Sequence, residues 1–387
     1  MIIGIDIRCL MDENYSGVSQ YTANLLSAIL DLDKDNEYRL FYNSWRNLDT
    51  RLALWQRPNS RVIGRHYPNK LFNYILQKGL AWPKLDQALG GVDLFFSPHF
   101  NFSALSSRTK KIITVHDLSF LRYPEFFSRR KNFWHRALKV KKILRAADRI
   151  IAVSESTKSD IVELIGAAPE KVRVIYSGNN LSGKRPSEPE ISAWRKTKNI
   201  TGRFILSLGT IEPRKNIAGL IEAFNSLKDQ GAYSDIKLVL AGARGWKNQS
   251  VAEAFKASPY QEDIIFLGYV SPAEQAILYA SAEVFVYPSF YEGFGFPPLE
   301  AMSYGRPVIC SNNSSLPEVV GEAGLMINPD QPAEISAAWR LILDDENLRN
   351  RLKEKGLARA KLFSWPKAAG EYLALFNELS QHDEKAS

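Results

Sequence analysis

The amino-acid sequence predicts an α/β protein with two doubly wound parallel sheets. Short runs of Val, Ile, Phe and Tyr alternate with helical patterns along almost all of the 387 residues, which is typical of βαβ units. A chain of this length is expected to form two domains, and its 45% hydrophobic residues are ample for two packed cores. A stretch rich in Ser, Pro, Lys and Glu separates the halves. The prediction is therefore a domain at 1–182, a linker at 183–202 and a domain at 203–365.

The strands and helices are predicted in chain order from their hydrophobic patterns. In the first half, the predicted strands are IIGIDI, EYRLFYN, VDLFFSP, KKIITVHD, RIIAVS and VRVIYS, with helices at GVSQYTANLLSAILDL and STKSDIVELIG. In the second half, the predicted strands are FILSLG, IKLVLAG, IIFLGYV, EVFVYPS and PVICSN, with helices at NIAGLIEAFNSLKDQ, PAEQAILYASA and PPLEAMSYG. The tail, residues 366–387, is again helical and is expected to fold back onto the first domain.

Charge is divided unevenly between the two halves. Residues 1–180 contain 27 Lys and Arg against 17 Asp and Glu, whereas residues 181–387 contain 23 against 25. The basic half is expected to face something anionic, such as phospholipid headgroups, a phosphorylated substrate or nucleic acid. No helix-turn-helix pattern or aromatic single-strand platform is present, so a nucleic-acid partner is disfavoured.

Cysteine usage and the N-terminus indicate a cytoplasmic protein. The two cysteines, Cys9 and Cys310, lie in apolar strand-like runs far apart in the sequence, so neither a disulfide framework nor a zinc cluster is expected. The start, MIIGIDIRCL, carries an Asp and an Arg and predicts a strand instead of a signal peptide. No apolar run approaches ~20 residues, so no membrane span is expected.

The stretch YEGFGFPPLE runs from a strand through a loop into a helix and has carboxylates at Glu292 and Glu300. Pro297 suits the first helical turn. The backbone amides of 293–295 are then expected at a helix N-terminus, where anions and hydroxyls bind favourably. Both carboxylates are expected in the ligand cleft at the strand ends. Alternatively, Glu300 only stabilises its helix dipole and Glu292 is solvated, but the whole constellation favours a functional site.

The stretch LSLGTIEPRKN predicts a basic turn after a strand that ends at Gly209. Arg214 and Lys215 precede a helix that Asn216 could cap. Two adjacent cations at this position could neutralise a diphosphate, Arg with a planar fork and Lys with a point charge. An ordinary basic turn is the alternative, and the position at a strand end favours the binding site.

Two positions in the first half are further candidates. His116 follows a strong predicted strand and is, of the five histidines, the one best placed for a cleft, although a structural hydrogen-bonded His is the alternative. Gly17 lies in Asn14-Tyr15-Ser16-Gly17, between the first strand and the first helix, where helix-terminal amides can meet a phosphate. The motifs GxGxxG and GxxxxGK[ST] are absent, which disfavours a dehydrogenase or a P-loop enzyme.

The stretch Arg129–Arg149 contains nine Lys and Arg against one acid and has aromatic and aliphatic residues interleaved. It is predicted as a basic amphipathic helix, which could lie on an anionic membrane surface. A solvated helix face whose apolar side packs on the sheet is an equally weighted alternative.

Taken together, these motifs resemble the retaining glycosyltransferases of GT-B fold, specifically glycosyltransferase family 4. The resemblance covers nearly the whole chain. It rests on the E-x7-E pair Glu292 and Glu300 and on GTIEPRKN, VHD, IAVSESTKSDI, VIYSG, FLGYV and FSWPKAA. It implies two Rossmann-like domains, the first for the acceptor and the second for a nucleotide sugar.

The resemblance also implies roles for individual residues. Arg214 and Lys215 would hold the donor diphosphate and stabilise the leaving group, Glu292 would hydrogen-bond the donor sugar, and His116 would lie beside the reacting sugar. Glu300 would bind the ribose. The implied donor-binding positions are Gly17, Gly209, Tyr269, Val270, Gly293, Phe294, Gly295 and Glu300. The family needs no metal and no cofactor besides the donor, and Asp31-Leu32-Asp33 is interpreted as a polar helix exit and not as a metal-binding DxD motif.

The GTIEPRKN form is similar to that of bacterial mannosyltransferases that assemble O-antigen or exopolysaccharide. This implies GDP-mannose as donor, a lipid-linked saccharide as acceptor, and a peripheral position on the inner face of the plasma membrane. Three alternatives remain open: the same chemistry with UDP-glucose, UDP-N-acetylglucosamine or another hexose donor, a catalytically silent nucleotide-sugar-binding protein, and an epimerase of the same fold.

Overall fold

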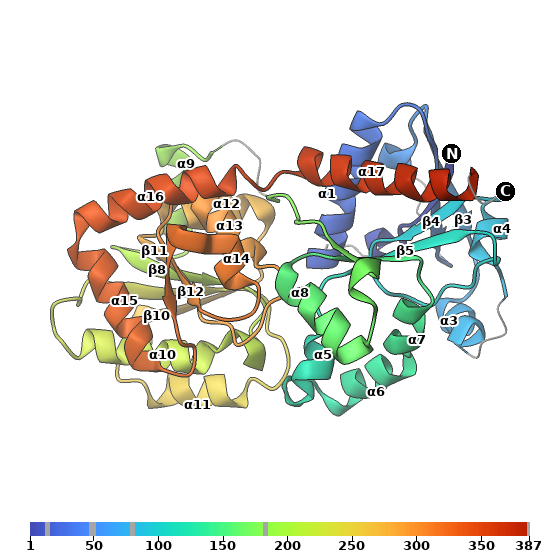
Figure 1. Ribbon diagram of the computed structural model, residues 1–387. Helices are drawn as coiled ribbons and strands as arrows, with labels where there is room; N and C mark the ends of the chain where they lie inside the picture. Colours follow the sequence, from blue (N-terminus) through green and yellow to red (C-terminus); the bar gives the residue numbers. More distant parts are fainter. Residues whose placement is uncertain (12–15, 46–51, 78–81, 181–184, 385–387) are drawn as a thin grey trace. The chain divides into compact units, whose positions relative to one another are not determined.

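A computed structural model describes residues 1–11, 16–45, 52–77, 82–180 and 185–384 of the chain (Figure 1). The chain forms two compact units. Unit 1 comprises Met1–Leu118, Arg129–Gly178 and Ser364–Ser387, and unit 2 comprises Ser119–Ser128 and Asn179–Phe363. Asn14 and Tyr15 of the predicted first loop lie outside the described residues, as do positions 183 and 184 of the predicted linker.

Unit 1 is built on a seven-stranded sheet of order β3-β2-β1-β4-β5-β6-β7, in which all neighbouring strands are parallel. Its strands are β1 (Ile2–Asp6), β2 (Glu37–Asn43), β3 (Ser60–Arg65), β4 (Leu94–Ser97), β5 (Lys110–Val115), β6 (Arg149–Ala152) and β7 (Val172–Val174). The predicted parallel sheet is confirmed, but β3 was not predicted. This edge strand has a neighbour on one side only, and Arg61, Gly64 and Arg65 interrupt its apolar signal.

Helices cover both faces of this sheet. They are α1 (Gly17–Leu32), α3 (Asn69–Gln77), α4 (Leu85–Ala88), α6 (Arg129–Ala137), α7 (Val140–Arg145), α8 (Glu155–Asp160) and α17 (Trp365–Glu384). Adjacent residues of β4 point to opposite faces, as strand geometry requires. Phe95 belongs to the cluster that includes Phe72 of α3, whereas Phe96 packs against Tyr372 and Phe376 of α17. The C-terminal helix α17 therefore completes the core of unit 1, beside α1 (Figure 1).

The predicted single basic helix at Arg129–Arg149 is wrong in one respect, because two short helices, α6 and α7, occupy this stretch. Lys139 lies between them in the left-handed region (φ 49°), which ends the first helix. Leu138, Val140 and Leu144 are buried, whereas no residue of α6 is buried. The apolar anchor of this stretch thus lies at the end of α6 and in α7, and α6 itself lies on the surface.

Unit 2 is built on a six-stranded parallel sheet of order β10-β9-β8-β11-β12-β13. Its strands are β8 (Phe204–Leu208), β9 (Lys237–Ala241), β10 (Ile264–Gly268), β11 (Val284–Tyr287), β12 (Val308–Ser311) and β13 (Gly324–Ile327). The second predicted sheet is thereby confirmed. Strand β13 was not predicted; it is again an edge strand and has only four residues.

The helices of unit 2 are α5 (Ser119–Arg122), α9 (Glu188–Thr197), α10 (Ile217–Lys228), α11 (Gln249–Ala257), α12 (Pro272–Ser281), α13 (Phe296–Ser303), α14 (Leu316–Val320), α15 (Pro332–Asp344) and α16 (Glu346–Ala360). One core cluster joins α10, α11 and α15 to the sheet, with Phe224 and Trp339 fully buried in it. Helix α9 falls in the predicted linker. Trp194 of α9 donates to Glu274 of α12 (3.1 Å) and so fixes α9 to unit 2.

Within the described ranges, no helix combines the length and the apolar character needed to cross a bilayer.

Candidate active site

The turn after β8 places the two predicted cations. Pro213 opens a short 3-10 helix, η6 (Pro213–Lys215), and Asn216 follows in the left-handed region (φ 54°) at the N-cap of α10. The expected side-chain cap is wrong, because the Asn216 amide donates to the carbonyl of Pro329 (2.6 Å). This bond links the turn to the loop after β13 and so holds Arg214 and Lys215 in place.

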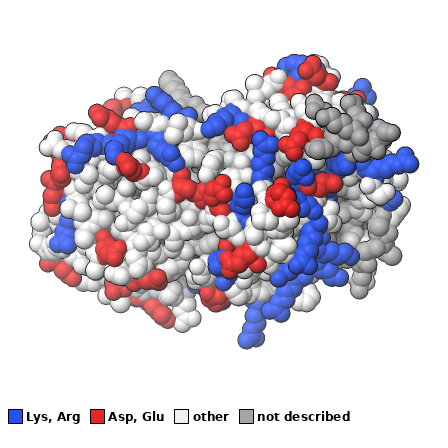
Figure 2. All heavy atoms as spheres, in the orientation of Figure 1, with Lys and Arg blue, Asp and Glu red and all other residues white. Residues whose placement is uncertain are grey.

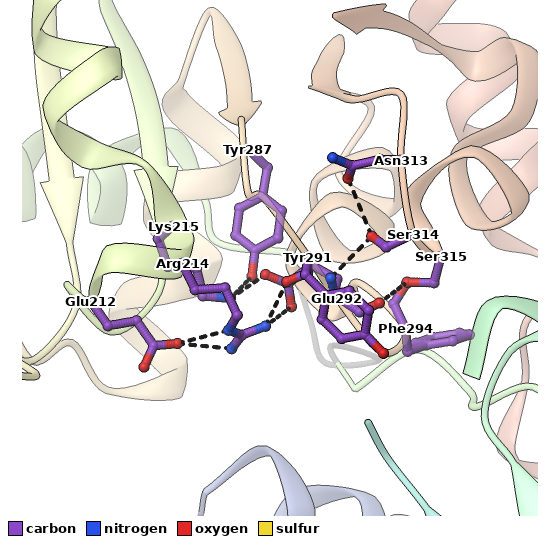
Figure 3. A network of polar contacts seen from close by, with 10 residues as sticks. All are labelled: Glu212, Arg214, Lys215, Tyr287, Tyr291, Glu292, Phe294, Asn313, Ser314 and Ser315. Atoms are coloured by element: carbon purple, nitrogen blue, oxygen red, sulfur yellow. Dashed lines mark hydrogen bonds and ion pairs between the residues drawn. The ribbon is translucent and has the colours of Figure 1, made fainter. Parts of the chain in front are cut away.

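Arg214 joins two carboxylates on different loops (Figure 3). Its Nε and Nη2 donate to Glu212 Oε1 at 3.1 and 2.8 Å, and its Nη1 donates to Glu292 Oε2 at 2.9 Å and to the Tyr291 carbonyl at 2.8 Å. The planar guanidinium is suited to such bridging. It therefore fixes the position of the Glu292 loop relative to the η6 turn.

Lys215 lies deeper in the same network. Its Nζ donates to Glu292 Oε1 (2.6 Å) and to the Tyr287 hydroxyl, and the ammonium lies 4.6 Å from the centre of the Tyr287 ring. Burial and the neighbouring Arg214 lower the pKa of Lys215, against the opposing effect of Glu292. A Cβ on Gly209 would make an ordinary contact with the Lys215 side chain at 3.6 Å, but the φ of 154° at Gly209 is one that other residues rarely adopt.

Glu292 is held as a carboxylate. Burial alone would raise the pKa of Glu292, but Arg214 and Lys215 outweigh it and bring the pKa to about 2. Glu292 is 7% exposed as a residue and its side chain is 9% exposed, so the two ion pairs form in largely dry surroundings. Dry surroundings strengthen the electrostatic interaction of these groups with any charge that develops nearby.

The loop that carries Glu292 is fixed by two serines that the sequence analysis did not single out. Ser314 Oγ accepts from the Glu292 amide (3.0 Å), and Ser315 Oγ lies within hydrogen-bonding distance of the carbonyls of Glu292 (3.0 Å) and Phe294 (2.9 Å), as Figure 3 shows. Tyr287 was likewise missed, although its position at the end of a predicted strand was a usable signal. The two serines gave no such signal in the sequence, because their hydrogen-bond partners lie more than 20 residues away.

Helix α13 starts where the sequence predicts. Gly295 is its N-cap, in a positive-φ conformation (102°) that glycine adopts most readily, and the two prolines fall in the first turn. Phe294 is buried and packs edge-on against Phe296 and Phe363. The backbone of 293–295 therefore approaches the N-terminus of α13, where hydroxyls and anions are favoured.

Glu300 lies apart from the Arg214–Lys215–Glu292 network. It is 5% exposed on α13, and Tyr279 Oη donates to its carboxylate (2.9 Å). Burial raises the pKa of Glu300 from 4.5 to about 7, although Tyr279 opposes the shift. The structure thus gives the two signature carboxylates opposite properties: Glu292 is ionised, and Glu300 titrates near neutrality.

The end of β10 presents the predicted base-binding positions. Gly268 adopts a positive φ (70°), Tyr269 is 61% exposed, and Val270 is 3% exposed immediately before Ser271, the N-cap of α12. The exposed ring next to an ordered helix start offers a stacking surface.

The two unit 1 candidates follow β1 and β5. Gly17 is the first residue of α1, and a Cβ added there would meet no described atom within 4 Å. His116 Nε2 lies 2.8 Å from the Pro98 carbonyl. Burial lowers the pKa of His116 to about 4, so the ring is neutral at pH 7. A carbonyl only accepts, so Nε2 carries the proton and Nδ1 carries the lone pair.

Comparison with known proteins identifies the family. Residues 15–182 match the family described as Glycosyltransferase Family 4, and residues 190–359 match the one described as Glycosyl transferases group 1. O-antigen chain mannosyltransferase B of Escherichia coli is 36% identical over 268 residues, which are 68% of this chain and 69% of that protein. The chain belongs to glycosyltransferase family 4.

Two further relatives of this family 4 chain differ in length. O-antigen chain mannosyltransferase RfbU of Salmonella typhimurium is 30% identical over 254 residues, 65% of each protein. The serotype-specific mannosyltransferase WbdA of Escherichia coli is 32% identical over 286 residues, which are 71% of this chain and 34% of that protein. The chain thus matches about a third of the length of WbdA.

Solved structures share the fold of the family 4 chain at low sequence identity. Sucrose-phosphate synthase of Thermosynechococcus elongatus matches with a TM-score of 0.73 at 21% identity, over 98% of this chain and 99% of that one. HepE of Anabaena, solved with UDP and glucose, matches with 0.74 at 18%, over 98% and 100%. WaaG, a glycosyltransferase involved in lipopolysaccharide biosynthesis, matches with 0.69 at 16%, over 95% and 98%. These matches concern the fold, and they confirm the predicted GT-B fold.

Across the described ranges, no group of three or more His, Cys, Asp and Glu side chains is arranged to hold a metal ion.

Proposed function

We propose that the chain transfers mannose from GDP-mannose, with retention of anomeric configuration, to a lipid-linked saccharide during synthesis of a cell-surface polysaccharide. The observation that carries the catalytic part is the buried network of Arg214, Lys215 and Glu292 beside the N-terminus of α13. The mannosyl donor and polysaccharide acceptor are proposed because the curated relatives are named O-antigen mannosyltransferases.

In this proposal, Arg214 and Lys215 bind the diphosphate of the donor. Negative charge grows on the leaving diphosphate as the bond to the sugar breaks, and preorganised buried cations stabilise such charge without rearrangement. Glu292, which is ionised, accepts hydrogen bonds from sugar hydroxyls, and the backbone of 293–295 reaches the same group. Metal independence stays a prediction.

The nucleoside part of the donor is assigned to other positions. Glu300 accepts hydrogen bonds from the ribose hydroxyls, and Tyr269 and Val270 line the base. Gly17 and His116 of unit 1 keep their predicted roles at the diphosphate and at the reacting sugar. The neutral His116 ring can accept a hydrogen bond at Nδ1 but cannot donate one there.

A peripheral membrane position is proposed because a lipid-linked acceptor is presented at a membrane. Figure 2 shows Lys and Arg side chains gathered over α6 and α7. Within α6, Phe133 is 75% exposed and Trp134 is 51% exposed between cations. Exposed aromatics framed by Lys and Arg suit the interface of an anionic bilayer.

A UDP-sugar is the second candidate donor, because HepE shares the fold and was solved with UDP and glucose. A panel of GDP-mannose, UDP-glucose and UDP-N-acetylglucosamine, each incubated with the protein in EDTA, distinguishes the two by slow release of free sugar. Preferential turnover of GDP-mannose is expected. Preferential turnover of a UDP-sugar would show that the donor is not GDP-mannose, while the chain would still be a glycosyltransferase. Turnover that requires an added divalent ion would overturn the prediction of metal independence.

A further inference from the structure

The motif FSWPKAA and the C-terminal helix that it opens have no role in the chemistry described so far. Helix α17 nevertheless contacts a side chain that touches His116. Tyr21 of α1 packs edge-on against the His116 ring, with ring centres 4.6 Å apart and planes at 87°. Tyr21 is 1% exposed, so this contact is part of the packed interior of unit 1.

A chain of buried hydroxyls fixes Tyr21 from the side of α17. The Tyr21 and Tyr372 hydroxyls are 2.7 Å apart, and the Tyr372 hydroxyl lies 2.6 Å from Thr114 Oγ1. Thr114 lies on β5, two residues before His116, which follows the strand. The contacts therefore close a circuit through three elements: from His116 to Tyr21 on α1, to Tyr372 on α17, to Thr114 and back along β5.

The same helix holds Tyr21 from a second direction. Trp365, the first residue of α17, packs edge-on against the Tyr21 ring at 5.3 Å, seven residues and so two turns before Tyr372. Trp365 is itself tightly placed, because a Cβ on Gly178 would lie 2.4 Å from its backbone nitrogen. Tyr372 is fixed by packing against Phe96 and Phe376.

We infer that Tyr21 and Tyr372 are positioning residues for His116, and that α17 sets the orientation of the His116 ring through them. The Pro98 carbonyl fixes which nitrogen carries the proton, but a single hydrogen bond leaves the ring free to tilt about it. The edge contact with Tyr21 removes that freedom, and the hydroxyl circuit removes the freedom of Tyr21. This inference rests on the proposed role of His116 beside the reacting sugar.

The test uses the full chain and the variant Tyr372→Phe, which deletes the shared hydroxyl and keeps the ring. Histidine side-chain resonances are recorded by NMR, with His116 assigned by its loss in His116→Asn. A changed His116 resonance and a kcat reduced roughly 5- to 10-fold with unchanged KM for the donor are expected, because both hydrogen-bonding contacts of the Tyr372 hydroxyl are lost. On the His116→Asn background, Tyr372→Phe should have no further effect on kcat.

Tyr233→Phe is the matched control, because it deletes a hydroxyl that donates to Asp344 from a buried tyrosine of unit 2. It should change neither the resonance nor kcat. Should Tyr372→Phe fail to fold, Thr114→Val breaks the same circuit from the other side. The inference would be overturned if Tyr372→Phe left the His116 resonance unaltered, or if it lowered kcat equally in the His116→Asn background. Failure of the proposed function has a different signature: no nucleotide sugar is turned over by the unsubstituted protein, while the resonance arm still decides the positioning role.

Discussion

Lys215, Arg214 and Glu292 show how far single positions could be predicted. Their side-chain types and their place at strand ends indicated a phosphate and sugar site, and the structure brings the three together in one buried network. The pairing itself was not predictable, because Lys215 and Glu292 are 77 residues apart and pair only once β8 and β11 lie side by side. Ser314 and Ser315 were missed for the same reason.

Glu300 is expected to make binding of the donor depend on pH. Because its pKa is raised to about 7, the side chain is largely protonated below pH 7 in the free protein. Ribose hydroxyls donate best to the ionised carboxylate, so the donor should bind more tightly as pH rises from 6 to 8, and binding at pH 6.5 should release protons. Calorimetry in buffers of different ionisation enthalpy measures that release.

Glu300→Gln is the matched control for this titration, since it keeps the shape and the bond to Tyr279 but cannot ionise. This variant should bind the donor weakly at every pH, and its binding should release no protons. Equal proton release by Glu300→Gln and by the unsubstituted protein would assign the titration to another group and contradict the role of Glu300.

Helix α6 is the element that we expect to meet a membrane. The sequence predicted its charge and its aromatics but not the break at Lys139, because the left-handed turn depends on burying Leu138, Val140 and Leu144 below it. Phe133 and Trp134 are exposed to solvent on this surface helix. The double substitution Phe133→Ser, Trp134→Ser should therefore weaken binding to vesicles rich in anionic lipid at least tenfold, as measured by flotation at low salt.

The control for α6 removes exposed apolar side chains from elsewhere. Leu341→Ser with Leu362→Ser deletes two leucines of unit 2 that are 57% and 55% exposed. Vesicle binding should be unchanged by this pair. Binding that falls equally in both double variants, or that is absent from the unsubstituted protein, would contradict a membrane-facing α6.

Of the described edge strands, β3 and β13 were not predicted, whereas β7 and β10 were. Central strands such as β4 and β8 were predicted correctly, because burial on both faces makes them continuous apolar runs. The missed strands β3 and β13 each have one strand neighbour; polar residues and a glycine interrupt the apolar pattern of β3, and β13 is only four residues long. The position of Asn216 was predicted but its bond to Pro329 was not, since that partner lies 113 residues away.

At the scale of the whole molecule, unit 1 is completed by a helix that follows unit 2 in the sequence. Helix α17 buries Ala369, Tyr372, Leu375 and Phe376 on unit 1. Burial of a large side chain such as Leu375 or Phe376 stabilises by roughly 1.5–3 kcal/mol, so the combined loss of the three large side chains approaches the ~5–15 kcal/mol stability of a typical domain. A chain that ends at Phe363 should therefore have an unfolded unit 1 and a folded unit 2.

Hydrogen exchange read by mass spectrometry measures whether each unit of the shortened chain is folded. Peptides from β1, β4 and β5 should exchange at the rate of an unfolded chain, whereas those from β8 and β11 stay protected. Protected β4 peptides in the shortened chain would show that unit 1 does not need α17.

We expect the buried network of Arg214, Lys215 and Glu292 to stabilise the leaving diphosphate, and turnover of GDP-mannose by Lys215→Met tests this role. The matched control is Lys228→Met, which replaces another buried lysine of unit 2, paired with Asp263 (2.8 Å), outside the proposed site. The expected result is a loss of kcat of about 100-fold or more for Lys215→Met, as for other groups that stabilise developing charge, and near-normal kcat per folded molecule for Lys228→Met. Equal turnover by the two variants would show that Lys215 does not stabilise the leaving group.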